Sequence, residues 1–547
     1  MAPTESESKA AAQAIKSEAN VLFQSRKFKE AYDKYGEAIA FDDTNAILFA
    51  NRAACSLELE EYLNAGCDAR KATKLDPKYI KAWARLGKAS QALRAYHRSI
   101  DAWESALACY LENTSGLSEV DKQLKASCEA GLRDAKNALK EAEKPQNDRV
   151  VIINKSVIDR GLLPWQIAER LEVDINKIGQ SSAWVILNAH REFERGCEKM
   201  FKTVETDSTV SGPIGAIADI TNGLLRDGRA FAATTPDWID TYNRQIIMEI
   251  QYYGAWPGSG PAEVQQKALA LQKEKGFQAC RGALGMTVRG WFMRAYLEEK
   301  GSGDPKSALE FYRSSLSVLE WGLKTWKDVP DSERGAIFTP TFIRGIRRHY
   351  LNAYLSACRG VNFRSTPGLD CEELDKLAEE QIEETKRNRP EGSEDYLRDG
   401  GFFCSFFLYP VAEALAIRGA IAIDKGVKLK ATDPERASEY LAQAKRHYMV
   451  AYNILPKDEE FRLLYIKVAI EAAWHRGDTL SECLAMVELM TADRPAVSKI
   501  WNYSVFKKNL DVHMAQIGNF QEQACMGIIE GDFSVHSPAT LINLYEC

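Results

Sequence analysis

The sequence of 547 residues lacks the short motifs that mark most catalytic and metal sites. Its 12 cysteines contain no Cys-x-x-Cys pair and its 7 histidines no His-Glu-x-x-His. No motif therefore indicates a zinc site or metal-assisted hydrolysis. Gly87-Lys88 lacks the upstream glycine of a phosphate-binding loop, and Gly258-Ser259-Gly260 lacks the strand that precedes a nucleophile elbow. We therefore predict no catalytic residue, no metal ligand and no cofactor, and we keep an enzyme of unknown type as an alternative.

Long apolar runs and a strong excess of one charge are also missing. The longest uncharged run, residues 400–412, is too short to span a bilayer and contains Pro410, which should interrupt a helix. Residues 1–7 are polar and acidic, unlike a leader peptide. The 71 basic and 77 acidic residues give a charge of -6, which argues against polyanion binding. We expect an intracellular protein with reduced thiols that neither inserts into membranes nor binds nucleic acid. The expected location is the cytoplasm, with the nucleus left open.

What the sequence does contain is a period of 34 residues, in three blocks that start at residues 12, 46 and 80. Small residues recur at the eighth and twentieth places of each block, and alanine at the twenty-seventh. These positions are occupied by Ala19, Ala53, Gly87, Ala31, Ala65, Ser99, Ala38, Ala72 and Ala106. Larger apolar residues fill the fourth place, as Ile15, Phe49 and Trp83. This period is the signature of tetratricopeptide repeats, in which pairs of antiparallel helices stack on their neighbours.

The periodicity predicts an all-α fold with two parts. We expect a disordered N-terminus over residues 1–11, three repeats with a capping helix over residues 12–145, and a larger α-helical domain of divergent helix pairs over residues 150–547. The capping helix should cover residues 118–144, which are charged and rich in alanine. In the larger domain, helices of repeat type are predicted after Asp304-Pro305, over residues 444–456 and over residues 461–474, with loops at 206–215, 360–369 and 386–400.

One segment of the larger part has the spacing of a helix-turn-helix, with a first helix over residues 164–174 and a second over residues 176–189. A helix that reads DNA needs exposed polar side chains, whereas the run from Ala183 to Leu187 is apolar. We therefore predict a packed helical hairpin here. We also expect His349, which follows Arg347 and Arg348, to lie on a basic helical face.

Five polar residues fall on the first helices of the three blocks, which line the concave surface of such an array. Lys16 and Asn20 are one turn apart, as are Lys81 and Arg85, and Asn51 takes the sixth place of its block, as Arg85 does. With these positions, residues 12–145 resemble the tetratricopeptide domains of co-chaperones. The resemblance implies a clamp that holds the C-terminal Glu-Glu-Val-Asp of cytosolic heat-shock chaperones. It further implies that Lys16, Asn20, Asn51 and Lys81 surround the terminal Asp, and that Arg85 supports the peptide.

These observations predict a co-chaperone or adaptor without catalytic activity. Its first part would hold the acidic tail of a heat-shock chaperone, and its second part would bind another partner or client that the sequence does not specify. The alternative is an assembly scaffold that holds protein partners without any chaperone. An enzyme in the C-terminal half is the remaining alternative, and a polar pocket with perturbed acids would be its first structural sign.

Overall fold

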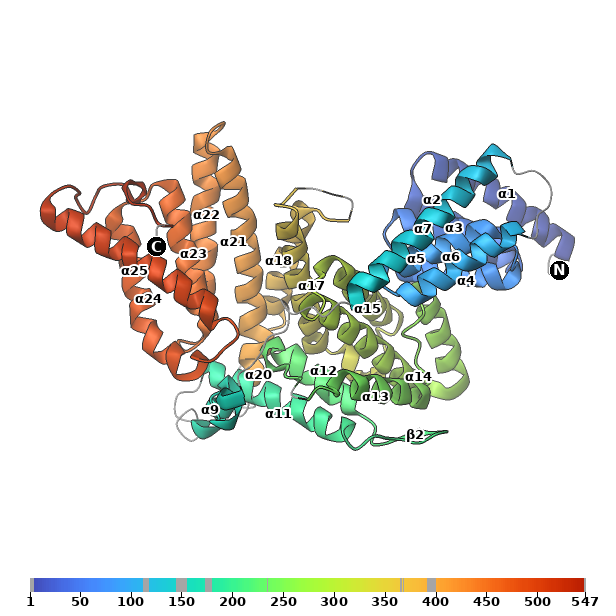
Figure 1. The fold of residues 1–547 in the computed structure, drawn as a ribbon, viewed down its shortest axis with the longest axis horizontal. Helices are drawn as coiled ribbons and strands as arrows, with labels where there is room; N and C mark the ends of the chain where they lie inside the picture. The colour runs from blue at the N-terminus through green and yellow to red at the C-terminus, as the bar shows by residue number, and fades with distance from the viewer. Residues whose placement is uncertain are drawn as a thin grey trace. The chain divides into compact units, whose positions relative to one another are not determined.

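A computed structural model describes residues 4–111, 118–143, 155–172, 180–233, 235–364, 366, 368–390 and 400–545. The described residues are helical apart from loops, two isolated bridges and one two-stranded hairpin of β1 (Val204–Glu205) and β2 (Val210–Ser211) (Figure 1). The predicted all-α fold is thus confirmed. The chain divides into two compact units, a first unit of residues 1–150 and 252–335 and a second unit of residues 151–251 and 336–547.

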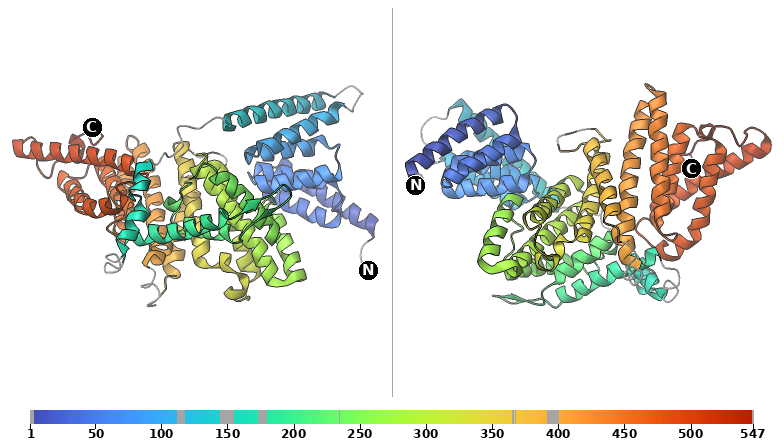
Figure 2. Two further views of the ribbon diagram at one scale, coloured as in Figure 1. Left: turned by 60° about the horizontal axis from the view of Figure 1, so that its bottom comes forward. Right: turned by 180° about the vertical axis from the view of Figure 1, so that it is seen from behind.

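The first unit begins with three pairs of helices that follow the 34-residue blocks. In chain order its helices are α1 (Glu5–Gln24), α2 (Phe28–Phe41), α3 (Ala46–Glu58), α4 (Tyr62–Leu75), α5 (Ile80–Ala92), α6 (Tyr96–Leu111), α7 (Glu119–Glu143), α14 (Pro261–Lys300), α15 (Pro305–Thr325) and α16 (Asp331–Arg334). The left panel of Figure 2 shows the first seven stacked in order. The alanines of the eighth, twentieth and twenty-seventh places are completely buried, which explains why only small residues fit there.

The first helix starts earlier than expected. Residues 1–11 were predicted to be disordered, but α1 begins at Glu5. Thr4 is its N-cap: the Thr4 hydroxyl accepts from the N–H of Glu7, and the Glu7 carboxylate accepts from the N–H of Thr4. This capping box and an ion pair one turn apart between Lys9 and Glu5 stabilise the turn before the first repeat.

The capping helix α7 packs against α6 through one tryptophan. Trp103 of α6 is 2% exposed and lies against Gly87 of α5 and Gly131 of α7. A Cβ atom would come within 2.6 Å of the Trp103 ring at Gly87 and within 2.5 Å at Gly131. Glycine at both positions therefore makes room for the indole ring, which joins the third repeat to the helix that covers it.

Helices α14 and α15 also pack on the repeats, although the expected division put them in the larger domain. The N-cap residue of α4, Glu61, makes no capping bond with its side chain, and the buried carboxylate of Glu310 in α15 accepts from the N–H of Leu63 at 2.8 Å instead. Before α14, the N–H of Gly260 donates to the Sγ of Cys67 at 2.9 Å. These contacts involve α4, the second helix of its pair, and therefore leave the surface formed by the first helices free of them.

The second unit is built from helices of unequal length. Its helices are α8 (Lys155–Asp159), α9 (Pro164–Arg170), α11 (Ser182–Met200), α12 (Ala216–Arg226), η1 (Gly228–Ala230), α13 (Trp238–Tyr253, which ends just inside the first unit), η2 (Ala336–Phe338), α17 (Pro340–Gly360), α18 (Cys371–Arg387), α20 (Gly400–Phe403), η3 (Cys404–Leu408), α21 (Tyr409–Leu429), α22 (Pro434–Ile454), α23 (Glu460–Arg476), α24 (Leu480–Trp501), α25 (Lys507–Glu530) and η4 (Ala539–Leu541). Successive helices α21 to α24 pack pairwise, and Figure 1 shows α21, α22 and α23 side by side. This unit therefore consists of divergent helix pairs, as the sequence predicted.

The repeat-type helices predicted at the sequence level are confirmed in both units. Asp304 caps α15 by accepting from the N–H of Ser307 at 3.1 Å. Ala444 and Tyr448 are buried on α22, against which α23 packs. The predicted loop at 206–215 contains the turn of the hairpin and β2, and the loop at 360–369 begins at the last residue of α17. Of the predicted loop at 386–400, residues 391–399 lie outside the described part of the chain, and α18 continues to Arg387.

The apolar run that contains Pro410 is part of one continuous helical segment, so the prediction that Pro410 interrupts it was wrong. α20, the π-helical turn η3 and α21 follow one another without a break. Pro410 cannot donate to the carbonyl of Phe406, and the Nη1 of Arg344 donates to that oxygen at 2.9 Å instead. Within the described residues, only this segment, Gly400–Leu429, is long and apolar enough to cross a membrane. Its most apolar window is 72% buried in the protein, as in a core helix that packs on α18 and α22.

The helical hairpin predicted around residue 176 has its second helix further along the chain. α11 begins at Ser182 and continues to Met200, whereas residues 173–179 lie outside the described part. The side chains of Ala183, Val185 and Leu187 are buried, so this apolar run packs in the core of the second unit. The helix does not present it to a nucleic-acid groove.

Candidate functional site

The five polar residues lie on the first helices of the three repeats. Lys16 and Asn20 belong to α1, Asn51 belongs to α3, and Lys81 and Arg85 belong to α5. Lys81 is exposed and the other four are partly buried. The structure therefore places all five on the first helices of the three pairs, α1, α3 and α5.

Three of the five converge on one hydroxyl group. Tyr35 of α2 is 2% exposed, and its hydroxyl donates to the Oδ1 of Asn20 at 2.6 Å. The side chain of Asn51 and the positive charge of Arg85 are both near enough to lower the pKa of Tyr35. Burial outweighs both effects and raises this pKa to about 12. Asn20, Asn51 and Arg85 thus come together from three helices, whereas Lys16 and Lys81 lie one turn away from them on α1 and α5.

No carboxylate in the described part of the chain forms an ion pair with the guanidinium group of Arg85. Its Nη1 is buried without a hydrogen-bond partner in the described residues, and the side chain faces the hydroxyls of Tyr79 and Tyr35. Loss of solvent around the charge is the largest cause of the lowered pKa of Arg85. The neighbouring Arg52 differs, because its Nε and Nη2 reach the carboxylate of Asp68 at 2.8 and 2.7 Å.

The two lysines share this lack of a partner. Neither Lys16 nor Lys81 forms an ion pair with any carboxylate that the structure describes. With Arg85, the surface therefore presents three cations without an anion and the amides of Asn20 and Asn51 beside them. Such a set can bind a group with one or two carboxylates, because each oxygen needs charge-assisted donors once water is removed.

Tyr35 was missed at the sequence level. It occupies a second helix, where an aromatic residue is expected simply to fill the core of the repeat. The signal that distinguishes it is its hydroxyl group, since a phenylalanine would fill the same space without a polar atom.

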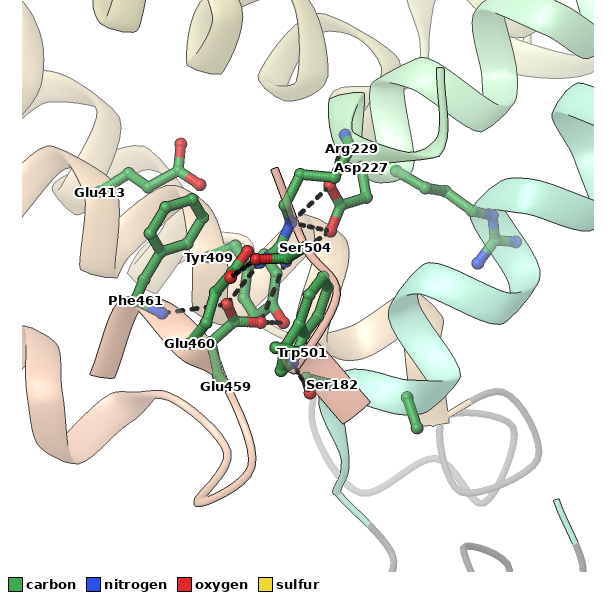
Figure 3. Close-up of polar contacts among 12 residues, drawn as sticks. Ser182, Asp227, Arg229, Tyr409, Glu413, Glu459, Glu460, Phe461, Trp501 and Ser504 are labelled. Atoms are coloured by element: carbon green, nitrogen blue, oxygen red, sulfur yellow. Dashed lines mark hydrogen bonds and ion pairs between the residues drawn. The ribbon is translucent and has the colours of Figure 1, made fainter. Parts of the chain in front are cut away.

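The second unit contains a cluster of buried charges centred on Arg229 of η1 (Figure 3). No sequence pattern predicted this cluster. Its guanidinium bonds the carboxylates of Asp227 at 2.7 Å, Glu459 at 2.6 Å and Glu460 at 2.9 Å. It also lies 3.9 Å from the centre of the Trp501 ring. Burial raises the pKa of Glu460 to about 7, partly opposed by Arg229.

Perturbed acids are the sign that an enzyme would show, but here each carboxylate is bound by a neighbouring side chain. Glu459 accepts from the hydroxyl of Tyr409, and Glu460 accepts from Ser504 at 2.5 Å. Because these residues come from α21, α23, α24, η1 and the loops beside them, the cluster links distant elements of the unit. Its arrangement is that of a structural crosslink.

The basic face expected around His349 is buried as well, which corrects that expectation. Arg348 bonds Glu413 at 2.6 Å, and the Nε2 of His349 lies 3.0 Å from the carbonyl of Leu224. Among the described residues, no group of three or more His, Cys, Asp or Glu side chains is arranged to hold a metal ion.

The fold and the site together define a helical-repeat protein whose first array is of tetratricopeptide type. No family model matches the chain. The small glutamine-rich tetratricopeptide repeat-containing protein 2 of Saccharomyces cerevisiae is 33% identical over 143 residues, which are 26% of this chain and 38% of the relative. The heat shock protein sti1 homolog of Schizosaccharomyces pombe is 34% identical over 124 residues, 22% of this chain and 21% of the relative.

A solved structure, the first tetratricopeptide domain of Spaghetti (RPAP3) bound to an HSP90 peptide, is 27% identical. The match covers 24% of this chain and 93% of the chain in that structure, with a TM-score of 0.21. The chain thus spans well under half the length of the two curated relatives. Its N-terminal part resembles tetratricopeptide co-chaperones, as the sequence analysis inferred.

Proposed function

We propose that the protein is a co-chaperone or adaptor whose first repeats hold the acidic C-terminal Glu-Glu-Val-Asp tail of a cytosolic heat-shock chaperone. In this proposal Lys16, Asn20, Asn51 and Lys81 bind the carboxylates of the terminal Asp, and Arg85 supports the peptide. The remaining helices bind another partner or client, and the protein acts in the cytoplasm without covalent chemistry.

The buried Nη1 atom of Arg85 carries this proposal. A buried charge is costly unless an opposite charge or hydrogen bonds compensate it, and the Nη1 of Arg85 lacks a partner among the described residues. A bound carboxylate would supply one. The 34% identity to the heat shock protein sti1 homolog of Schizosaccharomyces pombe supports the choice of a chaperone tail over other anions.

The first test is calorimetric titration of the full chain with a peptide that ends in Glu-Glu-Val-Asp. Loss of one partner of a desolvated charge pair costs about 2 to 5 kcal/mol, because the other partner stays buried and unpaired. A micromolar complex has a total of about 8 kcal/mol, so Lys81→Ala or Arg85→Ala should nearly abolish binding. Amidation of the peptide's C-terminus should do the same, because it removes one carboxylate.

Lys74→Ala is the matched control for these variants. Lys74 is an exposed cation on α4, outside the five positions, and its removal should leave the affinity unchanged. If the unmodified peptide does not bind, or if amidation leaves its affinity intact, the clamp is wrong. An assembly scaffold without a chaperone would then be the better interpretation.

A further inference from the structure

At the five positions, the hydroxyl of Tyr35 makes a hydrogen bond of defined direction. Tyrosine has one hydroxyl hydrogen, and in Tyr35 this hydrogen is donated to the Oδ1 of Asn20 at 2.6 Å. The bond joins α2 to α1, and its donor is 2% exposed. The buried phenol therefore fixes which end of the Asn20 amide points towards it.

This direction determines what the Asn20 amide offers to a ligand. Because the Oδ1 of Asn20 is engaged by Tyr35, its NH₂ group is the part left for a ligand. A carboxylate accepts hydrogen bonds and donates none, so it needs this NH₂ group and is repelled by an amide oxygen.

We infer that Tyr35 is a positioning residue of the clamp, which orients the side-chain amide of Asn20 so that its N–H donors face a bound carboxylate. This inference rests on the proposed function. Without the hydroxyl, the Asn20 amide can rotate and turn its oxygen to the ligand. Burial keeps Tyr35 protonated, so the donor is retained at every physiological pH.

The test is Tyr35→Phe in the full chain, titrated with the same free peptide and with its amidated form. Phenylalanine keeps the buried ring, so the repeat should fold and the melting temperature should change little. We expect binding of the free peptide to weaken about 3- to 10-fold, the range of one hydrogen bond. The residual binding of the amidated peptide should stay the same.

A double-mutant cycle with Asn20→Ala separates positioning from a general structural effect. If Tyr35 acts through Asn20, then Tyr35→Phe should have little further effect in the Asn20→Ala background. Tyr110→Phe is the matched control, because Tyr110 is also buried in the array and its hydroxyl has no partner among the described residues. It should bind like the wild type.

The outcomes of the proposed function and of this inference can be told apart. If the wild type binds the peptide while Tyr35→Phe binds equally well, or if the effects of Tyr35→Phe and Asn20→Ala simply add, the positioning role is wrong and the clamp stands. If the wild type itself does not bind, the proposed function fails and the positioning role falls with it.

Discussion

At the scale of single residues, Glu310 makes the stability of the first unit depend on pH. This buried carboxyl group accepts from the N–H of Leu63, and burial raises its pKa to about 7. An unfolded glutamate titrates near pH 4.3, so between about pH 4.3 and 7 the folded state holds a proton that the unfolded state releases. The free energy of unfolding should therefore fall as pH rises through this window, by up to about 4 kcal/mol, and then level off above pH 7.

Glu310→Gln should remove this dependence, since glutamine keeps an oxygen for the N–H of Leu63 and does not titrate. Urea denaturation of the full chain at pH 5 and pH 8, with a probe in the first unit, measures the free energy of unfolding at each pH. The variant should gain stability relative to the wild type as pH rises. Glu333→Gln, at an exposed glutamate of the same unit, is the control and should follow the wild type. Parallel profiles for wild type and Glu310→Gln would contradict this account.

At the scale of helices, the contact between Gly131 and Trp103 fastens the capping helix α7. A Cβ atom at Gly131 would lie 2.5 Å from the indole, so Gly131→Ala must push α7 away from α6. Overpacking costs about 1 to 3 kcal/mol, against a gain of about 1 kcal/mol from alanine's better helix propensity. We expect a net loss of stability and faster hydrogen exchange of the α7 amides.

Gly36→Ala provides the comparison within the same array. A Cβ atom there would meet only the Nη1 of Arg52, at the ordinary contact distance of 3.6 Å. This variant should be as stable as the wild type or gain up to about 1 kcal/mol, since alanine favours the helix. If both glycine variants show the same exchange rates in α7, the close contact with Trp103 does not fasten the helix.

The helices show which features the sequence could predict. The 34-residue period placed Ala19, Ala53 and Ala72 correctly, because a close approach of two helices admits only small side chains. It could not predict that α15 caps α4, because Glu310 and Leu63 are 247 residues apart and no local pattern links them. The continuous helix through Pro410 was missed for the same reason, as the replacement donor is Arg344 on another helix.

The candidate site also has residues that the sequence could predict and one that it could not. Its five residues followed from their phase in the repeat, since one helical turn sets which side chains share a face. Tyr35 did not follow, because the direction of a hydrogen bond between side chains of different helices is decided by packing. Two buried partners of Arg229, Glu459 and Glu460, are more than 200 residues from it in sequence, beyond the reach of any spacing argument.

At the scale of the whole molecule, the five positions occupy one surface of the first unit and leave most of the chain for other contacts. Affinity purification of the full chain beside a Lys81→Ala, Arg85→Ala double variant should separate the partners of the five positions from the partners of the other helices. Heat-shock chaperones with an acidic tail should be enriched on the wild type and lost from the variant, because two charges that neutralise the carboxylates are gone. Proteins retained by both should bind the remaining helices. Lys74→Ala should recover the complete wild-type set, and quantitative mass spectrometry measures each difference. If the double variant keeps the same chaperones as the wild type, they bind elsewhere on the molecule, and the five positions bind another anion.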